Sequence, residues 1–160
     1  INFNNRRKKT NKKYIGQISL NKDEIKYFME IAYEQACIAE KKGEVPIGCL
    51  IVCKNSKKII SKSYNQTEIS NDPTAHAEIL AIRKACKKIN DWRLTDYVLF
   101  TTLEPCKMCA EIIKESRIKE VYYGTKNLSK NKNIKKPSFK NMKIDKMSYQ
   151  LKGFFKKIRN

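Results

Sequence analysis

A histidine, a glutamate and two cysteines in this chain have the spacing of a catalytic metal site. His76 is the only histidine, Glu78 follows two residues later, and Cys106 and Cys109 form a Cys-x-x-Cys pair preceded by Pro105. Imidazole nitrogen and thiolate sulfur are the ligands that zinc prefers, and a site with three protein ligands leaves a fourth position for water. The pattern therefore predicts one catalytic Zn²⁺ per chain, bound by His76, Cys106 and Cys109.

Glu78 is predicted to carry protons and not to bind the metal. Zinc lowers the pKa of a bound water from about 15.7 towards roughly 7, which makes that water a nucleophile at neutral pH. A nearby carboxylate can take a proton from the water and deliver it to a ring nitrogen and then to a departing amine. His-x-Glu followed by Pro-Cys-x-x-Cys is the pattern of zinc-dependent hydrolytic deamination.

Each part of the pattern has a simpler interpretation when it is taken alone. A Cys-x-x-Cys pair is also found in redox sites and as half of a structural zinc site, and a lone histidine on a helix is commonly packed or solvated. The order of the histidine, the glutamate and the cysteine pair along the chain favours a catalytic zinc site.

The remaining cysteines fall in predicted helices or an apolar strand and are expected to be buried free thiols: Cys37, Cys49, Cys53 and Cys86. No secretory signal is visible, so we expect a reducing intracellular compartment, either the cytoplasm or an organelle such as a plastid or mitochondrion.

Two predicted helix starts position the metal ligands. Asp72-Pro73-Thr74 is typical of a helix N-terminus and would begin a helix that continues to Lys88. Glu104-Pro105 is a second such start, and Cys106 and Cys109 would share one face of its first turn. The positive end of each helix dipole favours thiolate, so both starts suit the metal site.

The other predicted elements complete an α/β fold. A capped, amphipathic helix is expected from Asn21 to Lys42, followed by a hairpin of strands 47–53 and 59–64. Strands 97–101 and 120–123 flank the second zinc helix as a parallel βαβ unit. The prediction is a three-layer α/β/α sandwich with a mixed central sheet.

We divide the chain into a basic, disordered segment (1–20), a core (21–125) and a basic C-terminal segment with a terminal helix (126–160). The sequence begins at Ile1, so we expect an initiator Met, and possible further upstream residues, to be missing. No stretch has the ~20 apolar residues that a membrane span needs.

Several longer motifs resemble the bacterial-type tRNA adenosine deaminases, a family with the cytidine deaminase-like fold. These motifs are Glu44–Gly48, Asn71–Ile79, Thr102–Ala110 and Ser116–Ile118. The resemblance covers about residues 21 to 125 in good register and the last few residues weakly. It implies that the core deaminates adenosine to inosine at the wobble position of tRNA, that the tRNA is bound through its anticodon stem-loop, and that the protein is a homodimer.

The resemblance also implies a substrate pocket. Its members would contact an unpaired base and ribose, or the surrounding RNA, and they are Glu44, Val45, Asn65, the backbone N–H of Ala77, Asn127, Phe154 and Phe155. Asn65 is equally typical of a turn. At Asn127 the family usually has an aspartate, and at Lys107 it commonly has an apolar residue. The Asn127 amide predicts weaker discrimination against deoxyribose, unless Asn127 is only a cap or turn residue, and the Lys107 side chain is expected to point away from the metal.

Charge is concentrated at the two ends of the sequence. The net charge is +19, of which residues 1–20 carry +6 and residues 126–160 carry +11, leaving +2 on residues 21–125. Basic ends suit a polyanion, because each neutralised phosphate releases counterions. The chain is also rich in Lys, Asn and Ile, the composition expected from an AT-rich genome, so charge only supports the RNA prediction.

Two other functions remain open from the sequence. A deaminase of a free base or nucleoside, such as guanine or cytidine, would use the same zinc site but would not need basic ends. A non-catalytic RNA-binding subunit of a deaminase dimer would keep the fold, but it would be expected to lose Glu78, which is present.

Overall fold

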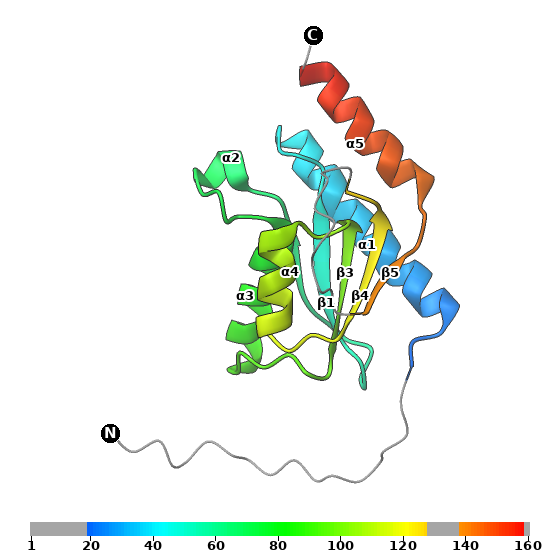
Figure 1. Ribbon diagram of the computed structural model, residues 1–160, viewed down its shortest axis with the longest axis vertical. Helices are drawn as coiled ribbons and strands as arrows, with labels where there is room; N and C mark the ends of the chain where they lie inside the picture. The colour runs from blue at the N-terminus through cyan, green and yellow to red at the C-terminus, as the bar shows by residue number, and fades with distance from the viewer. Residues whose placement is uncertain (1–18, 128–137, 159–160) are drawn as a thin grey trace, which may run out of the picture.

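A mixed five-stranded sheet lies between two layers of helices (Figure 1). The computed structural model describes residues 19–127 and 138–158. The predicted basic segment 1–20 therefore lies outside the described residues, apart from its last two positions. The described elements are α1 (Lys22–Lys41), β1 (Gly48–Cys53), β2 (Ile59–Tyr64), α2 (Thr67–Ser70), α3 (Ala77–Ile89), β3 (Tyr97–Leu103), α4 (Lys107–Glu115), β4 (Glu120–Thr125), β5 (Ser138–Asn141) and α5 (Asp145–Ile158).

The sheet has the strand order β2-β1-β3-β4-β5. Strand β1 pairs in the antiparallel sense with both β2 and β3, whereas β4 is parallel to β3 and β5 is parallel to β4. The predicted hairpin and the predicted parallel βαβ unit are both present. The three-layer sandwich with a mixed sheet is thus confirmed.

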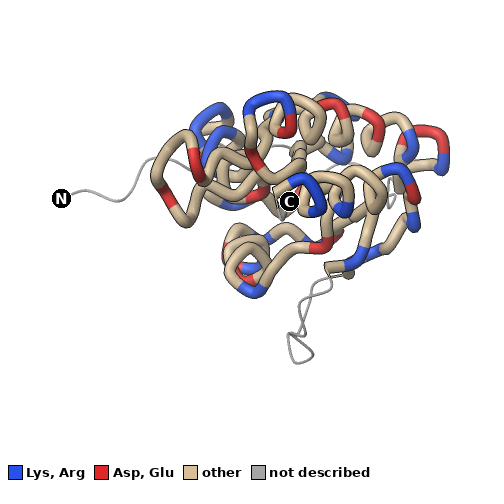
Figure 2. The backbone as a smooth tube through the Cα atoms, turned by 90° about the horizontal axis from the view of Figure 1, so that it is seen from above, with Lys and Arg blue, Asp and Glu red and all other residues tan. Residues whose placement is uncertain are grey.

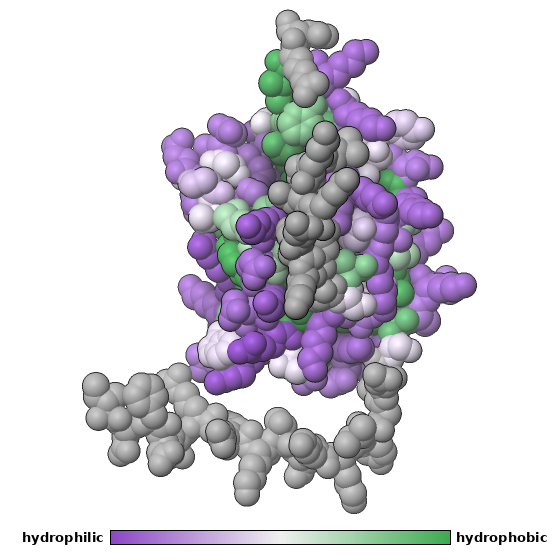
Figure 3. All heavy atoms as spheres, viewed as in Figure 1, coloured by the Kyte–Doolittle hydropathy of each residue, from purple (hydrophilic) through white to green (hydrophobic). Residues whose placement is uncertain are grey.

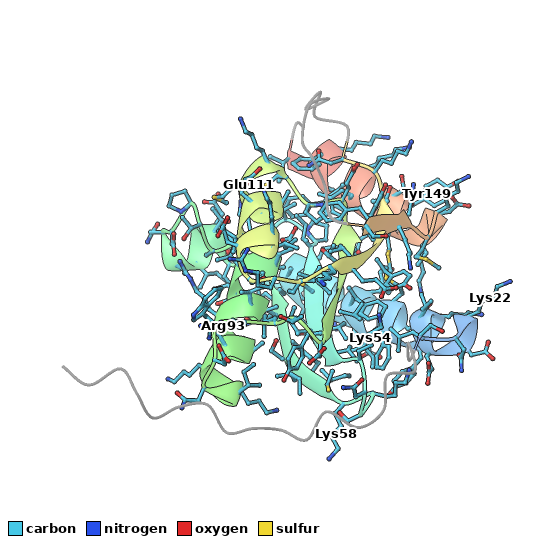
Figure 4. All side chains as sticks on the ribbon, turned by 60° about the horizontal axis from the view of Figure 1, so that its bottom comes forward. Lys22, Lys54, Lys58, Arg93, Glu111 and Tyr149 are labelled. Carbon is cyan, nitrogen blue, oxygen red and sulfur yellow. The ribbon has the colours of Figure 1, made fainter. Side chains whose placement is uncertain are left out.

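Alternating side chains of the strands divide the core into two halves. Leu50, Val52, Val98 and Phe100 pack against α1 and the start of α5, whereas Cys49, Ile51, Leu99 and Val121 pack against α3 and α4. Figure 4 shows these layers from another side, with Arg93 and Glu111 on the α3 and α4 side and Lys22 and Tyr149 on the other. Because successive strand residues face opposite ways, one sheet supports both helical layers.

Helix α1 forms where the sequence pattern predicts it. Asn21 accepts a hydrogen bond from the Glu24 N–H at 2.8 Å, and the Glu24 side chain accepts from the Asn21 N–H at 2.9 Å, which completes a capping box. The helix crosses β1 so closely that a Cβ on Gly48 would lie 2.1 Å from the Ala32 carbonyl oxygen. Gly43, with φ of +77°, reverses the chain at the end of α1 and leads it to Glu44.

Two elements depart from the sequence prediction. The pattern does not predict β5, which is short, pairs only with β4 and buries little of its surface. It also does not predict α2, a single helical turn without buried residues. Both lack an apolar period that a sequence pattern could detect.

The surface carries charges of both signs over the described residues. Basic and acidic residues are interspersed along the helices when the molecule is seen from above (Figure 2). The face in Figure 3 is mostly hydrophilic, and apolar atoms appear along the upper part of α5, where Phe155 is 42% and Ile158 is 64% exposed. Of the helices in the described ranges, none combines the length and hydrophobicity needed to cross a membrane.

Candidate active site

Two helix N-termini bring the predicted metal ligands together. His76 immediately precedes α3 and Cys106 immediately precedes α4, each with extended backbone, and Cys109 lies in the first turn of α4. The ligand atoms of His76, Cys106 and Cys109 all lie within 4.8 Å of one another. The Nδ1 atom of His76 is 3.7 Å from the Cys106 sulfur and 3.4 Å from the Cys109 sulfur.

The start of the first zinc helix differs from the prediction. Helix α3 begins at Ala77, and Asp72-Pro73-Thr74 forms a turn in place of the predicted helix start. Asp72 Oδ1 accepts hydrogen bonds from both the Thr74 N–H, at 2.8 Å, and the Thr74 hydroxyl, at 2.7 Å. This side-chain turn competes with helical hydrogen bonding, so His76 stays extended and precedes the helix.

Glu78 is buried beside these ligands, in the first turn of α3. It is 3% exposed, and its Oε2 atom has no hydrogen-bond partner within the described part of the chain. Burial raises the pKa of Glu78 and a backbone hydrogen bond lowers it. Burial is the larger effect, and the resulting pKa is about 7. A carboxyl group with such a pKa can both accept and donate a proton at neutral pH.

Each of the two cysteines shifts the pKa of the other. The pKa of Cys106 is lowered to about 4, first by a hydrogen bond with Cys109 and also by His76. The same contact with the Cys106 thiolate, followed by burial, raises the pKa of Cys109. If both sulfurs and the Glu78 carboxyl group were ionised, they would repel one another, and a divalent cation would offset that repulsion. The convergent sulfur, sulfur and nitrogen donors, together with the orphaned Glu78 oxygen, therefore fit a zinc ion.

Two of the predicted pocket residues, Glu44 on the loop after α1 and Asn65 directly after β2, are hydrogen-bonded to each other. Asn65 is 3% exposed, and its Nδ2 donates to Glu44 Oε2 at 2.9 Å. Glu44 is fully buried, and Val45 is half-buried. Ala77 is buried at the first position of α3, where a backbone N–H has no intrahelical acceptor.

The predicted site residues in the C-terminal part of the chain differ in how exposed they are. Asn127 is half-buried two residues after the end of β4, and its N–H donates to Glu104 Oε2 at 3.2 Å. Phe154 is buried and makes an edge contact with Phe155, which is 42% exposed. Only the second phenylalanine thus presents a large surface to solvent. The Lys107 side chain is exposed at the start of α4.

Two residues that the sequence did not single out form hydrogen bonds with predicted site residues. The Thr67 hydroxyl donates to Asn65 Oδ1 at 3.1 Å, and Glu104 holds the backbone of Asn127. Glu104 could have been found from its place directly before Pro105 and Cys106. Thr67 carries no comparable signal, because its contact depends on a turn that no pattern predicts.

The other cysteines are free thiols, as expected, but most are not fully buried. Only Cys49 is buried, and Cys37, Cys53 and Cys86 are half-buried. Cys37 lies within α1, Cys86 within α3, and Cys53 at the end of β1.

Comparison with known proteins agrees with the motifs. Residues 22–125 match the family described as the cytidine and deoxycytidylate deaminase zinc-binding region. The chain is 43% identical over 145 residues to the tRNA-specific adenosine deaminase of Rickettsia bellii, covering 82% of this chain and all of that one. The predicted resemblance, the deaminase fold and zinc as the cofactor are thereby confirmed.

Solved structures give the same likeness. A structure from work on A-to-I editing by tRNA:A34 deaminases at the wobble position has a TM-score of 0.66 and 37% identity, covering 74% of this chain and 98% of that one. A guanine deaminase from Bacillus subtilis has a TM-score of 0.60 and 39% identity, covering 67% of this chain and 66% of that one.

Proposed function

The chain belongs to the cytidine and deoxycytidylate deaminase zinc-binding family. Within that family, we propose that it hydrolytically deaminates adenosine to inosine at the wobble position of tRNA. The observation that carries this proposal is the position of Glu78, buried with a pKa of about 7 beside three convergent ligands. The tRNA substrate is supported by the relatives that are named for it.

In the proposed reaction, water adds to C6 of adenine, the C6–N bond to the exocyclic amine breaks, and ammonia leaves. Glu78 takes a proton from the attacking water, passes it to the ring nitrogen N1, and later transfers a proton to the departing amine. His76, Cys106 and Cys109 would hold the zinc. Zinc bound there supplies Lewis acidity that makes water nucleophilic near neutral pH. Because Glu78 is buried, its proton exchanges mainly with the reacting atoms and not with bulk water.

Asn65, Val45 and the Ala77 N–H are proposed to form the pocket for the flipped-out adenosine. An asparagine amide can donate and accept at once, which suits a ribose hydroxyl or a base edge. Asn127, just after β4, is proposed to lie near the ribose and phosphate of the same nucleotide. Its neutral amide would neither repel phosphate nor select a ribose hydroxyl as strongly as an aspartate would.

The anticodon stem-loop is proposed to contact α5 as well. Phe155 offers an exposed aromatic face, and Lys152, Lys156 and Lys157 lie exposed on the same helix. Stacking on an aromatic ring and neutralisation of phosphates are the usual means by which proteins bind unpaired RNA. The charge of +11 on residues 126–160 supports this assignment.

The test is an assay of the purified protein with three substrates: a tRNA with adenosine at the wobble position, free adenosine and free guanine. Inosine formed in the tRNA at a rate far above that from free adenosine is the expected result. A matched tRNA with guanosine at the wobble position is the control. Turnover of guanine alone would overturn the proposal.

Guanine deamination is the second candidate, because a guanine deaminase is 39% identical to this chain over the matched region. The same metal site would serve that reaction, in which C2 of guanine replaces C6 of adenine as the carbon attacked. The basic ends of the chain and the fully covered tRNA-specific relative favour tRNA.

We also propose that the protein is a homodimer in an intracellular, reducing compartment, whether cytoplasmic or organellar. Trp92 is 50% exposed and Ile69 is 53% exposed, and exposed side chains of this size are common in interfaces. The six cysteines are all free thiols, which suits a reducing compartment. Sedimentation equilibrium at micromolar concentration tests the dimer, and a purely monomeric protein would contradict it.

A further inference from the structure

Glu44 forms an unusual anchor at the edge of the candidate site. It is fully buried, and its two carboxylate oxygens accept three hydrogen bonds. Oε2 accepts from Asn65 Nδ2 at 2.9 Å and from the Glu68 N–H at 3.3 Å, and Oε1 accepts from the Ile69 N–H at 2.7 Å. A buried carboxylate is costly unless such donors surround it, so these bonds explain why an acid is present here.

The loop that Glu44 holds connects two residues of the candidate site. Residues 66–75 run from Asn65 to His76, and they contain α2, which projects beyond the end of the sheet (Figure 1). The Gln66 N–H donates to the Ala75 carbonyl at 3.0 Å, which closes the base of the loop. Within the described residues, the hydrogen bonds that tie 67–74 to any segment outside 65–76 all end on Glu44.

Glu44 itself is held by the rest of the protein. Its backbone N–H donates to the Ala39 carbonyl at 3.0 Å, directly after the turn at Gly43, so α1 fixes its position. The loop is therefore linked through one side chain to a rigid helix. Packing of side chains does little to fix the loop to the rest of the protein, since Ile69 is 53% exposed and α2 has no buried residue.

The same carboxylate fixes which way the Asn65 amide faces. Glu44 can only accept, so Nδ2 must face it, and the Thr67 hydroxyl then donates to Oδ1 on the other side. These two contacts use one N–H and one lone pair of the amide. One N–H and one lone pair of Asn65 are left for a further partner.

From these contacts we propose that Glu44 is a positioning residue that does not touch substrate: it orients the Asn65 amide and anchors the 66–75 loop against the bound nucleotide. This inference rests on the proposed function for the identity of the substrate. It differs from the expectation that Glu44 lines the pocket, because both of its oxygens are occupied inside the protein.

The test compares Glu44→Gln with Glu68→Gln. The glutamine at position 44 places an N–H₂ group against donors, so at least one of the three hydrogen bonds is lost. Glu68→Gln removes the same charge from an exposed side chain of the same loop and keeps every backbone N–H. Glu44→Met, which has a similar length but no acceptor oxygen, removes all three hydrogen bonds and serves as the more severe second variant, whereas Glu44→Gln keeps one acceptor and is the less demanding of the two for folding.

Two measurements are made on each folded variant. Amide hydrogen exchange should be at least about tenfold faster at Glu68 and Ile69 in both Glu44 variants, with core amides of β1 unchanged. With tRNA as substrate, KM should rise by about tenfold to hundredfold, the equivalent of losing one buried charged hydrogen bond, while kcat and zinc content change little. Glu68→Gln should behave as wild type in both.

The outcomes separate this inference from the proposed function. A purely structural role would lower kcat through loss of active enzyme and leave KM unchanged, and that result would overturn the inference. An unchanged exchange rate at Glu68 and Ile69 would also overturn it. If the wild-type protein does not act on tRNA, the proposed function fails, but the exchange measurement still decides whether Glu44 anchors the loop.

Discussion

The sulfur of Cys109 lies 3.4 Å from Nδ1 of His76, although the two residues are 33 positions apart in the chain. The contact arises because α3 and α4 pack on the same face of the sheet with their N-termini adjacent. The positive ends of both helix dipoles therefore meet where thiolate charge must be stabilised. A metal bound there would hold the starts of two helices together.

Replacing Glu78 should abolish turnover without loss of zinc. Glu78→Gln keeps the size of the side chain but cannot accept and release a proton, so kcat should fall by at least about 10²-fold to 10⁴-fold. Elemental analysis should still find one zinc per chain, because the carboxylate is not a ligand. Glu111→Gln, which changes an exposed acid on α4, is the control and should keep normal activity. A Glu78→Gln enzyme with normal kcat would refute the proton-carrier role.

Removing a ligand should cost both metal and stability. Cys109→Ala leaves two protein ligands, so zinc content should fall well below one per chain, and the melting temperature should fall with it. The same fall is expected when a strong chelator strips the wild-type protein, and added zinc should reverse it. Cys86→Ala, outside the site, is the matched cysteine control. Full zinc occupancy in Cys109→Ala would exclude this residue as a ligand.

Lys107 should have little effect on the metal or on the reaction. Its side chain is exposed at the first position of α4, between two ligands whose sulfurs lie within the site. Lys107→Val should keep one zinc per chain and change kcat by no more than about threefold, since removing an exposed cation alters a nearby charge only weakly. The measurement is steady-state kinetics at saturating tRNA. A large loss of kcat there would mean that Lys107 reaches the substrate.

The two phenylalanines of α5 should behave differently when each is changed to alanine. Phe154 is buried, so Phe154→Ala should lower the free energy of unfolding by about 3 kcal/mol. Phe155 is 42% exposed, so Phe155→Ala should leave stability nearly unchanged but raise the dissociation constant for tRNA about fivefold to a hundredfold through lost stacking. Urea denaturation and filter binding measure the two effects. Equal binding by wild type and Phe155→Ala would remove Phe155 from the RNA surface.

Glu120 should make stability depend on pH in acid. Burial opposes ionisation, but hydrogen bonds from Lys140, Tyr122 and Lys54 lower the pKa of Glu120 to about 2. A lowered folded-state pKa contributes stability that is complete above the ordinary value of 4.5 and is lost as the pH falls towards 2.

Glu120→Gln should therefore lower the free energy of unfolding by about 1–2 kcal/mol at pH 7, after allowance for solvent screening, and by clearly less at pH 3. Denaturant titrations at the two pH values measure this difference. Glu34→Gln, an exposed acid on α1, should show the same small effect at both. A pH-independent effect of Glu120→Gln would contradict the lowered pKa.

The sequence alone was enough to predict the chemistry and most of the architecture. The types and order of His76, Glu78, Cys106 and Cys109 indicate a metal, a nucleophile and a proton carrier, because few other reactions need that combination. The strands and α1 follow from apolar periods and from the Asn21 cap, which are local properties of the chain. Local signals of this kind can be read without knowledge of the partners in space.

Only the tertiary structure decided how the residues around this centre are held. The helix of His76 begins at Ala77 because the Asp72 side chain bonds to Thr74, and β5 exists because β4 offers an open edge. The hydrogen bonds of Glu44 could not be read from the sequence either, since two of its three donors are the backbone N–H groups of Glu68 and Ile69. Every residue but proline carries such a group, so no pattern of side chains marks which of them a buried carboxylate will meet.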